Sequence, residues 1–434
     1  MTVFRGTVLD TPDDPFAGGT LRAEEDAGLV ERGGTIVARG PFALVRTAYP
    51  DDEVVDLRGG LVLPGLVDTH VHFPQVRVIG ALGMPLLEWL ESCALPEEAR
   101  LADHRYALGV TRDLVGGLVR AGTTTALVFG SHFAAAVDAL FAEADRVGLR
   151  VTSGLVVSDR ALRPDLLTTP QRAHDEGLEL ARRWHGVRRS RYAVTPRFSL
   201  SCSAELLASC AVLQESVPGS WFTSHLNESV QEVDTVRRLF VDADHYLHTY
   251  AGHGLVGARS VLAHNVHPTT EELVLLAAAG ASVAHCPSSN SALGSGLFPL
   301  RDHLEHGVHV ALGSDVAAGT GFCLLKEGLQ AYFVQQLLGE RGSPLTAAHL
   351  LHLATAAGAE ALGLADRVGQ LSVGHELDLV WLRPEPGSTL DVALAHARSS
   401  EDALAKTFAL GSSADVAGTW VAGRQLAAAV PLRA

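Results

Sequence analysis

The 434-residue sequence is poor in lysine and cysteine. Only two of its 34 basic residues, Lys326 and Lys406, are lysines, and the others are arginines. The five cysteines are scattered and form no C-x-x-C pair, which argues against a disulfide framework and for a reducing compartment. No apolar stretch approaches the roughly 18 residues that a membrane span needs, and the N-terminus lacks the pattern of a secretory signal. We therefore expect a cytoplasmic protein that has no membrane partner.

The chain also lacks the positive charge that nucleic-acid binding requires. It has 34 Lys and Arg against 49 Asp and Glu, which gives a net charge of -15. Affinity for a phosphate backbone comes from clustered Lys and Arg, so we expect no nucleic-acid partner. The hydrophobic content of 47% is typical of a globular protein, and the length permits one large domain or two to three smaller ones.

Short apolar segments alternate with helix-like segments through the central part of the chain. The expected strands are 66–72, 124–130, 149–157, 191–198, 221–228, 260–266, 281–287 and 309–315. Eight such units predict an α/β fold with a (β/α)8 barrel over residues 64–368. Segments 1–63 and 369–434 instead contain short strands separated by Gly, Pro and Asp turns. They predict a small β-sandwich domain that is built from both termini.

Polar residues recur where the expected barrel strands end, and that is where a (β/α)8 barrel carries its chemistry. His70 and His72 lie two apart at the end of the first strand, so their side chains point the same way. His225 and His264 end the fifth and sixth strands, and Asp315 ends the eighth. A lone histidine at such a place is more often structural, but this many together favour a metal site. Imidazoles with one carboxylate suit Zn²⁺ and leave room for a water, and Fe²⁺ or Mn²⁺ would also be tolerated.

This order of residues, H-x-H followed by His, His and Asp, resembles the amidohydrolase superfamily. More narrowly, the segments PGLVDTHVHFPQ, MPLLEWLESCALPEEAR, TPRFSLSCS, SHLNES and AHCPSSN are similar to guanine deaminases. The resemblance covers essentially the whole chain and implies a homodimer. Some members hold two metals that are bridged by a carboxylated lysine, but here no lysine precedes Lys326. A mononuclear centre with one Zn²⁺ per chain is therefore implied.

The resemblance also implies a role for each site residue. The metal would lower the pKa of a bound water to about 7. Asp315 would accept the water proton and later pass one to ammonia, while Glu228 would shuttle a proton to the purine ring. His264 would hydrogen-bond the hydroxide or the tetrahedral intermediate, or it would have a merely structural role beside the metal. The implied metal ligands are His70, His72, His225 and Asp315.

Three further residues are candidates for substrate recognition. Guanine presents two acceptors, O6 and N7, on one edge. The guanidinium of Arg197 can donate a hydrogen bond to each of them. Adenine has the N6 donor in place of O6 and would leave a guanidinium donor unpaired. A structural ion pair is the alternative role of Arg197. The amide of Gln75 can donate and accept at the purine edge. Phe198 either lines the pocket or packs in the core.

The implied activity is the hydrolytic deamination of guanine to xanthine and ammonia, and other functions stay open. The same mononuclear site could deaminate another aminopurine or heterocycle, such as 8-oxoguanine or an s-triazine. A non-catalytic scaffold would be expected to have lost a ligand or Glu228, and neither is lost. A deaminase of nucleic-acid bases would carry the H-x-E…P-C-x-x-C signature, which is absent.

Other parts of the sequence receive weaker predictions. His285, at the end of the seventh strand, has no ligand role in this pattern and is expected to be structural. Residues 241–258 show no pattern with a role, and we expect surface or interface positions there. Residues 74–100 are the candidate for the segment that closes over the substrate.

Overall fold

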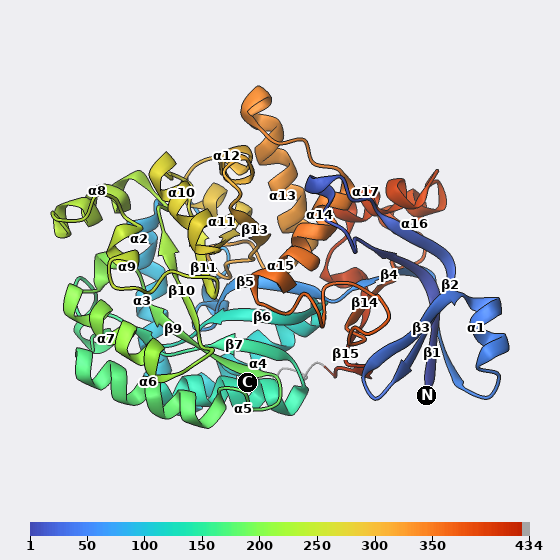
Figure 1. Ribbon diagram of the computed structural model, residues 1–434, viewed down its shortest axis with the longest axis horizontal. Coiled ribbons are helices and arrows are strands. Elements are labelled where there is room, and N and C mark those ends of the chain that lie inside the picture. Colours follow the sequence, from blue (N-terminus) through green and yellow to red (C-terminus); the bar gives the residue numbers. More distant parts are fainter. Residues whose placement is uncertain (428–434) are drawn as a thin grey trace.

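The chain folds into a barrel that is flanked by a separate sheet made from both ends of the chain (Figure 1). The computed structural model describes residues 1–427. Figure 1 shows the barrel strands surrounded by helices on the left and the sheet of the two chain ends on the right. Within residues 1–427, no helix is both long and apolar enough to cross a bilayer.

Eight parallel strands follow one another around the barrel in chain order, which confirms the predicted (β/α)8 fold. Between the first and last strands, the Asp315 amide donates to the His70 carbonyl at 2.8 Å and the His72 amide donates to the Val316 carbonyl at 3.0 Å. The strands are β5 (Leu66–His72), β6 (Thr123–Phe129), β7 (Arg150–Ser153), β9 (Ser190–Pro196), β10 (Trp221–Leu226), β11 (Ser260–His264), β12 (Ser282–His285) and β13 (His309–Leu312).

The third predicted strand, 149–157, is divided into β7 and the short β8 (Val156–Val157), which pairs with β9. The division lies at Gly154, where the chain passes very close to its neighbour. A Cβ atom at this position would lie 1.7 Å from the carbonyl oxygen of Ala193. Only glycine permits this approach, so the local crowding, which the apolar pattern does not reveal, interrupts the strand.

Several barrel strands end two or three residues earlier than predicted. At the ends of β10, β11 and β13 the cause is a change of backbone conformation, because φ is 48° at Asn227, 74° at His264, 47° at Asn265 and 47° at Asp315. A residue in the left-handed backbone conformation changes the direction of the extended chain, so that the strand ends there. Asp315 therefore stands on the turn beyond β13, and Glu228 on the turn beyond β10.

Amphipathic helices surround the barrel. The helix at residues 270–279 begins with a capping box, in which the Thr269 hydroxyl accepts from the Glu272 amide and the Glu272 carboxylate accepts from the Thr269 amide, as its first-turn sequence predicts. The helices after the strands are α4 (His104–Arg120), α5 (Ala134–Val147), α6 (Pro170–Trp184), α7 (Ala204–Ser216), α8 (Val230–Leu239), α9 (His248–Ala251), α10 (Thr270–Ala279), α11 (Pro287–Ala292), α12 (Leu300–Glu305), α13 (Leu324–Leu337), α14 (Ala347–Ala354) and α15 (Ala356–Ala361).

A single helical segment follows β5 and covers one end of the barrel. It begins as α2 (Leu86–Trp89), passes through a π-helical turn (Leu90–Ala94) and continues as α3 (Leu95–Ala99). A π turn inserts one extra residue into an α-helix and occurs frequently at functional sites. This segment lies within residues 74–100, which were predicted to close over the substrate.

The two ends of the chain share one seven-stranded mixed sheet, in which β1 pairs parallel with β4 and β4 pairs antiparallel with β14. The strands are β1 (Thr2–Asp10), β2 (Arg22–Arg32), β3 (Thr35–Pro41), β4 (Glu53–Pro64), β14 (Leu379–Leu382), β15 (Val416–Val421) and β16 (Arg424–Gln425). These segments also contain helices that the expectation of strands alone missed. They are α1 (Phe42–Ala48), α16 (Thr389–Ala395) and α17 (Ser400–Leu410), and Ser388 and Ser399 cap the last two.

Candidate active site

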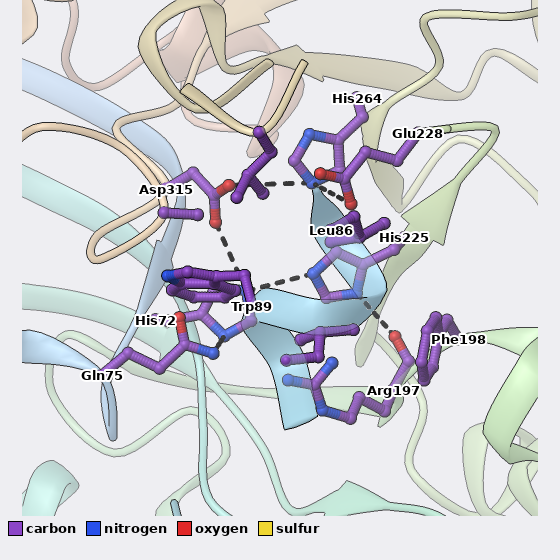
Figure 2. Close-up of a pocket in the computed structure, with 13 residues that line it drawn as sticks. His72, Gln75, Leu86, Trp89, Arg197, Phe198, His225, Glu228, His264 and Asp315 are labelled. Atoms are coloured by element: carbon purple, nitrogen blue, oxygen red, sulfur yellow. Dashed lines mark hydrogen bonds and ion pairs between the residues drawn. The ribbon is translucent and has the colours of Figure 1, made fainter. Parts of the chain in front are cut away.

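The four side chains that were expected to hold a metal lie together at the carboxyl end of the barrel. Figure 2 shows three of them, His72, His225 and Asp315. His70 and His72 come from β5, His225 from β10, and Asp315 from the turn after β13. The Nε2 atoms of His70 and His72 lie 3.3 and 3.4 Å from Oδ1 of Asp315. His72 Nε2 lies 3.0 Å from His225 Nε2. All four residues are buried.

This cluster fits one divalent cation. Ligand atoms about 2.0 to 2.2 Å from a tetrahedral metal are separated from one another by roughly 3.3 to 3.6 Å, close to the observed spacings. Nε2 of His70 is buried and has no hydrogen-bond partner among residues 1–427. Burial lowers the pKa of His72 and of His225 well below the usual range, so both imidazoles are neutral, as a metal ligand must be. His225 Nδ1 donates to the Arg197 carbonyl at 2.6 Å, which directs Nε2 toward the cluster.

Glu228 and His264 face the metal cluster from the side of β10 and β11. His264 Nε2 lies 3.5 Å from Oε2 of Glu228 and 3.8 Å from Oδ2 of Asp315. Its Nδ1 lies 2.9 Å from Oδ1 of Asn290 on α11, which fixes the ring. Burial and then the charge of Glu232 raise the pKa of Glu228 well above its usual range. Burial lowers the pKa of His264 to about 4. Glu228 therefore holds a proton more readily than a free glutamate does, and His264 is a neutral imidazole at pH 7.

A small pocket joins the metal cluster to the residues expected to recognise the substrate. Figure 2 shows Gln75 and Arg197 on one side of His72 and His225, with Glu228 and His264 on the other. The other lining residues are mostly apolar and include Leu86, Trp89, Leu90, Phe198, Leu293 and Ala318. The enclosed space is about 20 Å³, which is enough for roughly one water molecule. A purine can enter only if part of the lining moves, and four lining residues belong to segment 74–100.

Two groups of residues near the site were not predicted from the sequence. The first is Glu98, whose carboxylate contacts both Gln75 and Arg197, together with His132 behind it. Glu98 lies within the segment PLLEWLESCALPEEAR, and the only available signal was the similarity of that segment to known deaminases. His132 follows β6 directly, so its position at a strand end was the signal.

The second group lies in residues 241–258, and the prediction of surface or interface positions is wrong for its two tyrosines. Tyr246 and Tyr250 are buried. The Tyr250 hydroxyl accepts from the Ser199 amide and from the Ser224 hydroxyl, each at 2.9 Å, and donates to the His225 carbonyl at 2.9 Å. Tyr250 therefore supports the strand that carries His225. The spacing of the two tyrosines, i and i+4, was a helical signal for one buried face.

The structure agrees with a packing role for His285. Its ring stacks on Phe298 with a centroid separation of 4.1 Å, and neither ring nitrogen has a hydrogen-bond partner within the described chain. Burial lowers the pKa of His285 to about 3, so the ring is neutral.

Comparisons with known proteins agree with this geometry. Residues 61–426 match the amidohydrolase family. A probable guanine deaminase of Deinococcus radiodurans is 60% identical over 98% of both chains. The solved Escherichia coli guanine deaminase superposes with a TM-score of 0.94 at 37% identity and covers 98% of this chain and 99% of its own. A guanine deaminase from C. acetobutylicum, solved with guanine in its active site, has a TM-score of 0.89 at 25% identity, with 98% and 99% covered. The chain therefore belongs to the amidohydrolase family of hydrolases that act on carbon–nitrogen bonds, and within that family it groups with the guanine deaminases.

Proposed function

We propose that this protein hydrolyses guanine to xanthine and ammonia. The observation that carries the proposal is the position of Arg197, a buried arginine that faces the same small pocket as the metal cluster and Glu228. An arginine fork can donate to O6 and N7 of guanine, whereas the N6 amine of adenine would place a donor against it. Because Arg197 is buried, a donor that adenine left unpaired could not form a hydrogen bond with water instead. The mismatch would therefore weaken the binding of adenine.

The remaining lining residues complete the binding of a flat purine. The amide of Gln75 lies beside His72, with Nε2 3.2 Å from Nδ1 of the imidazole, so it reaches the edge of the pocket nearest the cluster. Phe198 and Trp89 add apolar area that suits a planar ring. With its O6 edge on Arg197, the purine would present its C2 amine toward Glu228 and Asp315, across the pocket.

Hydrolysis then requires two proton carriers. A divalent metal held by His70, His72, His225 and Asp315 would supply a Lewis acid that makes water a nucleophile near neutral pH. As the water oxygen bonds to C2, Asp315 accepts a water proton and Glu228 donates its proton to N3. The resulting carbon carries both OH and NH₂. Asp315 next protonates the amine, the C2–N bond breaks, and Glu228 takes the hydroxyl proton, which leaves xanthine, ammonia and both carboxyl groups as they began. His264 lies between the two carboxyl groups, and because its neutral ring carries the proton on Nδ1 toward Asn290, its Nε2 can accept a hydrogen bond from the hydroxyl on C2.

We further propose zinc as the metal, one ion per chain, because three imidazoles and one carboxylate suit Zn²⁺, which can expand to five ligands and so accept a water. Metal analysis of purified protein tests this directly. About one zinc per chain is expected, and a second equivalent of tightly held metal would contradict the mononuclear site.

A homodimer in a reducing compartment such as the cytoplasm completes the proposal. Phe333 and Leu337, one turn apart on α13, are 45% and 74% exposed, which supports an apolar contact surface there. All five cysteines lie in the described chain and all are free, which suits a reducing compartment. Light scattering should give twice the chain mass, and Leu337→Glu should shift the protein to monomer.

The function itself is tested by ammonia release from guanine, adenine, cytosine and 8-oxoguanine. Guanine should be turned over fastest, and Glu228→Gln should lower kcat at least about 100-fold while the metal content stays unchanged. Faster turnover of another ring would keep the metal site but overturn the role given to Arg197. A metal-loaded protein that turns over none of these rings would overturn the proposed function.

A further inference from the structure

Glu98 connects the residues that the proposed function assigns to substrate recognition. One carboxylate oxygen, Oε1, accepts from Arg197 Nη2 at 2.7 Å and from Gln75 Nε2 at 2.8 Å. The other oxygen, Oε2, lies 3.4 Å from His132 Nε2. Because a single oxygen holds both donors, the positions of the guanidinium and of the amide depend on each other.

The helical segment after β5 brings Glu98 to the pocket. Leu90 lines the pocket, and Glu98 follows it by eight residues. In a regular α-helix, eight residues rotate a side chain by roughly 80° beyond two full turns. The π-helical turn Leu90–Ala94 turns less per residue and removes much of that offset, so that Glu98 faces the same side as Leu90. The π-helical turn thus directs the Glu98 side chain toward the substrate site.

Charge explains why a carboxylate is needed here. Arg197 and Glu98 are each only 2% exposed, and a buried guanidinium requires a counter-charge. Glu98 is the sole acidic group within ion-pair distance of Arg197 among residues 1–427. Burial would raise the pKa of Glu98, but the charge of Arg197 and the contact with His132 hold it at about 2, so the carboxylate is ionised at pH 7.

The contact uses only part of the guanidinium. Nη2 of Arg197 donates to Glu98, while its Nε is buried and has no hydrogen-bond partner in the part of the chain that the structure describes. A buried donor without a partner is costly, and an acceptor supplied by a ligand would remove that cost. Glu98 therefore fixes the group at one end and leaves other donors for a substrate.

We propose that Glu98 is a positioning residue for purine recognition, which holds Arg197 and Gln75 in the orientation that reads the O6 and N7 edge. The inference rests on the proposed function, and it goes further by naming the group that sets the selectivity. Glu98 does not touch the substrate, so its effect must appear through Arg197 and Gln75.

Glu98→Gln tests this role, with guanine and 2-aminopurine as the two substrates. 2-Aminopurine keeps the reacting amine and N7 but has no O6, so it gains less from a well-placed arginine. We expect KM for guanine to rise about tenfold or more, with kcat changed less than about threefold, and the guanine to 2-aminopurine ratio of kcat/KM to fall about tenfold. The metal content should not change.

The neighbouring Glu97 provides a matched control. It is also buried in α3, but its carboxylate contacts Tyr106 and Arg100 on the outer side of the segment. Glu97→Gln should leave the selectivity ratio unchanged. If Glu98→Gln leaves the ratio unchanged, or if Glu97→Gln lowers it equally, the inference is wrong.

A double variant covers the case in which Glu98→Gln fails to fold because Arg197 is left unpaired. Arg197→Met with Glu98→Gln removes both charges. Its selectivity ratio should equal that of Arg197→Met alone, because only Arg197 is proposed to contact O6, the atom by which the two substrates differ at this edge. A further tenfold fall in the double variant would overturn the inference. Wild-type protein without activity on guanine would instead overturn the proposed function, and this one measurement separates the two failures.

Discussion

Glu327 is a buried acid that should make the stability of the protein depend on pH. It lies in the first turn of α13, is 1% exposed, and accepts hydrogen bonds from the amide of Ser288 at 3.0 Å and from its hydroxyl at 2.6 Å. Ser288 is the second residue of α11, which also carries Asn290, the partner of His264. Burial raises the pKa of Glu327 from 4.5 to about 8. The side chain is therefore neutral in the folded protein at pH 7.

The magnitude follows from the difference between the folded and unfolded states. The folded state binds the Glu327 proton more tightly, so the contribution of this proton to stability is full below about pH 4.5 and is lost as the pH rises to about 8. From pH 5 to pH 7 the loss is roughly 2 to 3 kcal/mol, at about 1.4 kcal/mol per pKa unit once the unfolded group has ionised. With an unfolding entropy of about 2 cal/mol/K per residue, this corresponds to roughly 2 to 3 °C in Tm.

Glu327→Gln removes the titration and keeps the shape of the side chain. Scanning calorimetry of both proteins at pH 5 and pH 7 should show the Tm of the variant rising relative to wild type by roughly 2 to 3 °C between these pH values. Comparing the two proteins cancels the other titrating groups. Glu340→Gln, at an exposed acid just after α13, should give no such change. A difference in Tm that is the same at both pH values would refute the claim that Glu327 is protonated in the folded protein.

Four other predictions test the site and its support. His225→Ala should lower metal affinity by at least about 100-fold and abolish activity, measured by metal analysis after dialysis. Tyr250→Phe leaves the buried Ser199 amide short of its acceptor and should cost about 1 to 3 kcal/mol, measured by urea denaturation. Arg197→Met should reduce selectivity for guanine but not metal content, because the backbone carbonyl that orients His225 is kept. Amide hydrogen exchange in residues 76–100 should slow when xanthine is added, and unchanged exchange would contradict closure by this segment.

The sequence was sufficient to predict the barrel. It was also sufficient to predict that His70, His72, His225 and Asp315 lie close together. Parallel strands in chain order bring their carboxyl ends to one rim, so residues as distant as His70 and Asp315 meet without any knowledge of side-chain packing. The strand ends were less predictable. At His264 and Asp315 the backbone adopts positive φ, at a cost of about 1 to 3 kcal/mol each, and no apolar pattern signals that the surrounding structure can maintain it.

The recognition side of the pocket was harder to predict because it depends on helical register. Glu98 follows Glu97 in an acidic pair, and an ordinary helical count does not show which of the two faces inward. The π turn directs Glu98, and not Glu97, toward the pocket. Helix propensities do not reveal such an insertion. His132 and Tyr250 were missed for a related reason, since their importance lies in polar contacts with residues far away in the chain.

These differences separate the site into two halves with different physical requirements. The proposed metal half would need its ligands at nearly fixed separations, and rigid barrel strands carry most of the side chains that could serve. The proposed recognition half includes Gln75 and Glu98 from the segment after β5, which supplies four of the residues that line the pocket. Arg197 joins the halves, because its carbonyl holds His225 while its side chain pairs with Glu98. We therefore expect that a change in ring preference can arise in the segment after β5 without loss of the proposed metal site, since the backbone contact of Arg197 does not depend on its side chain.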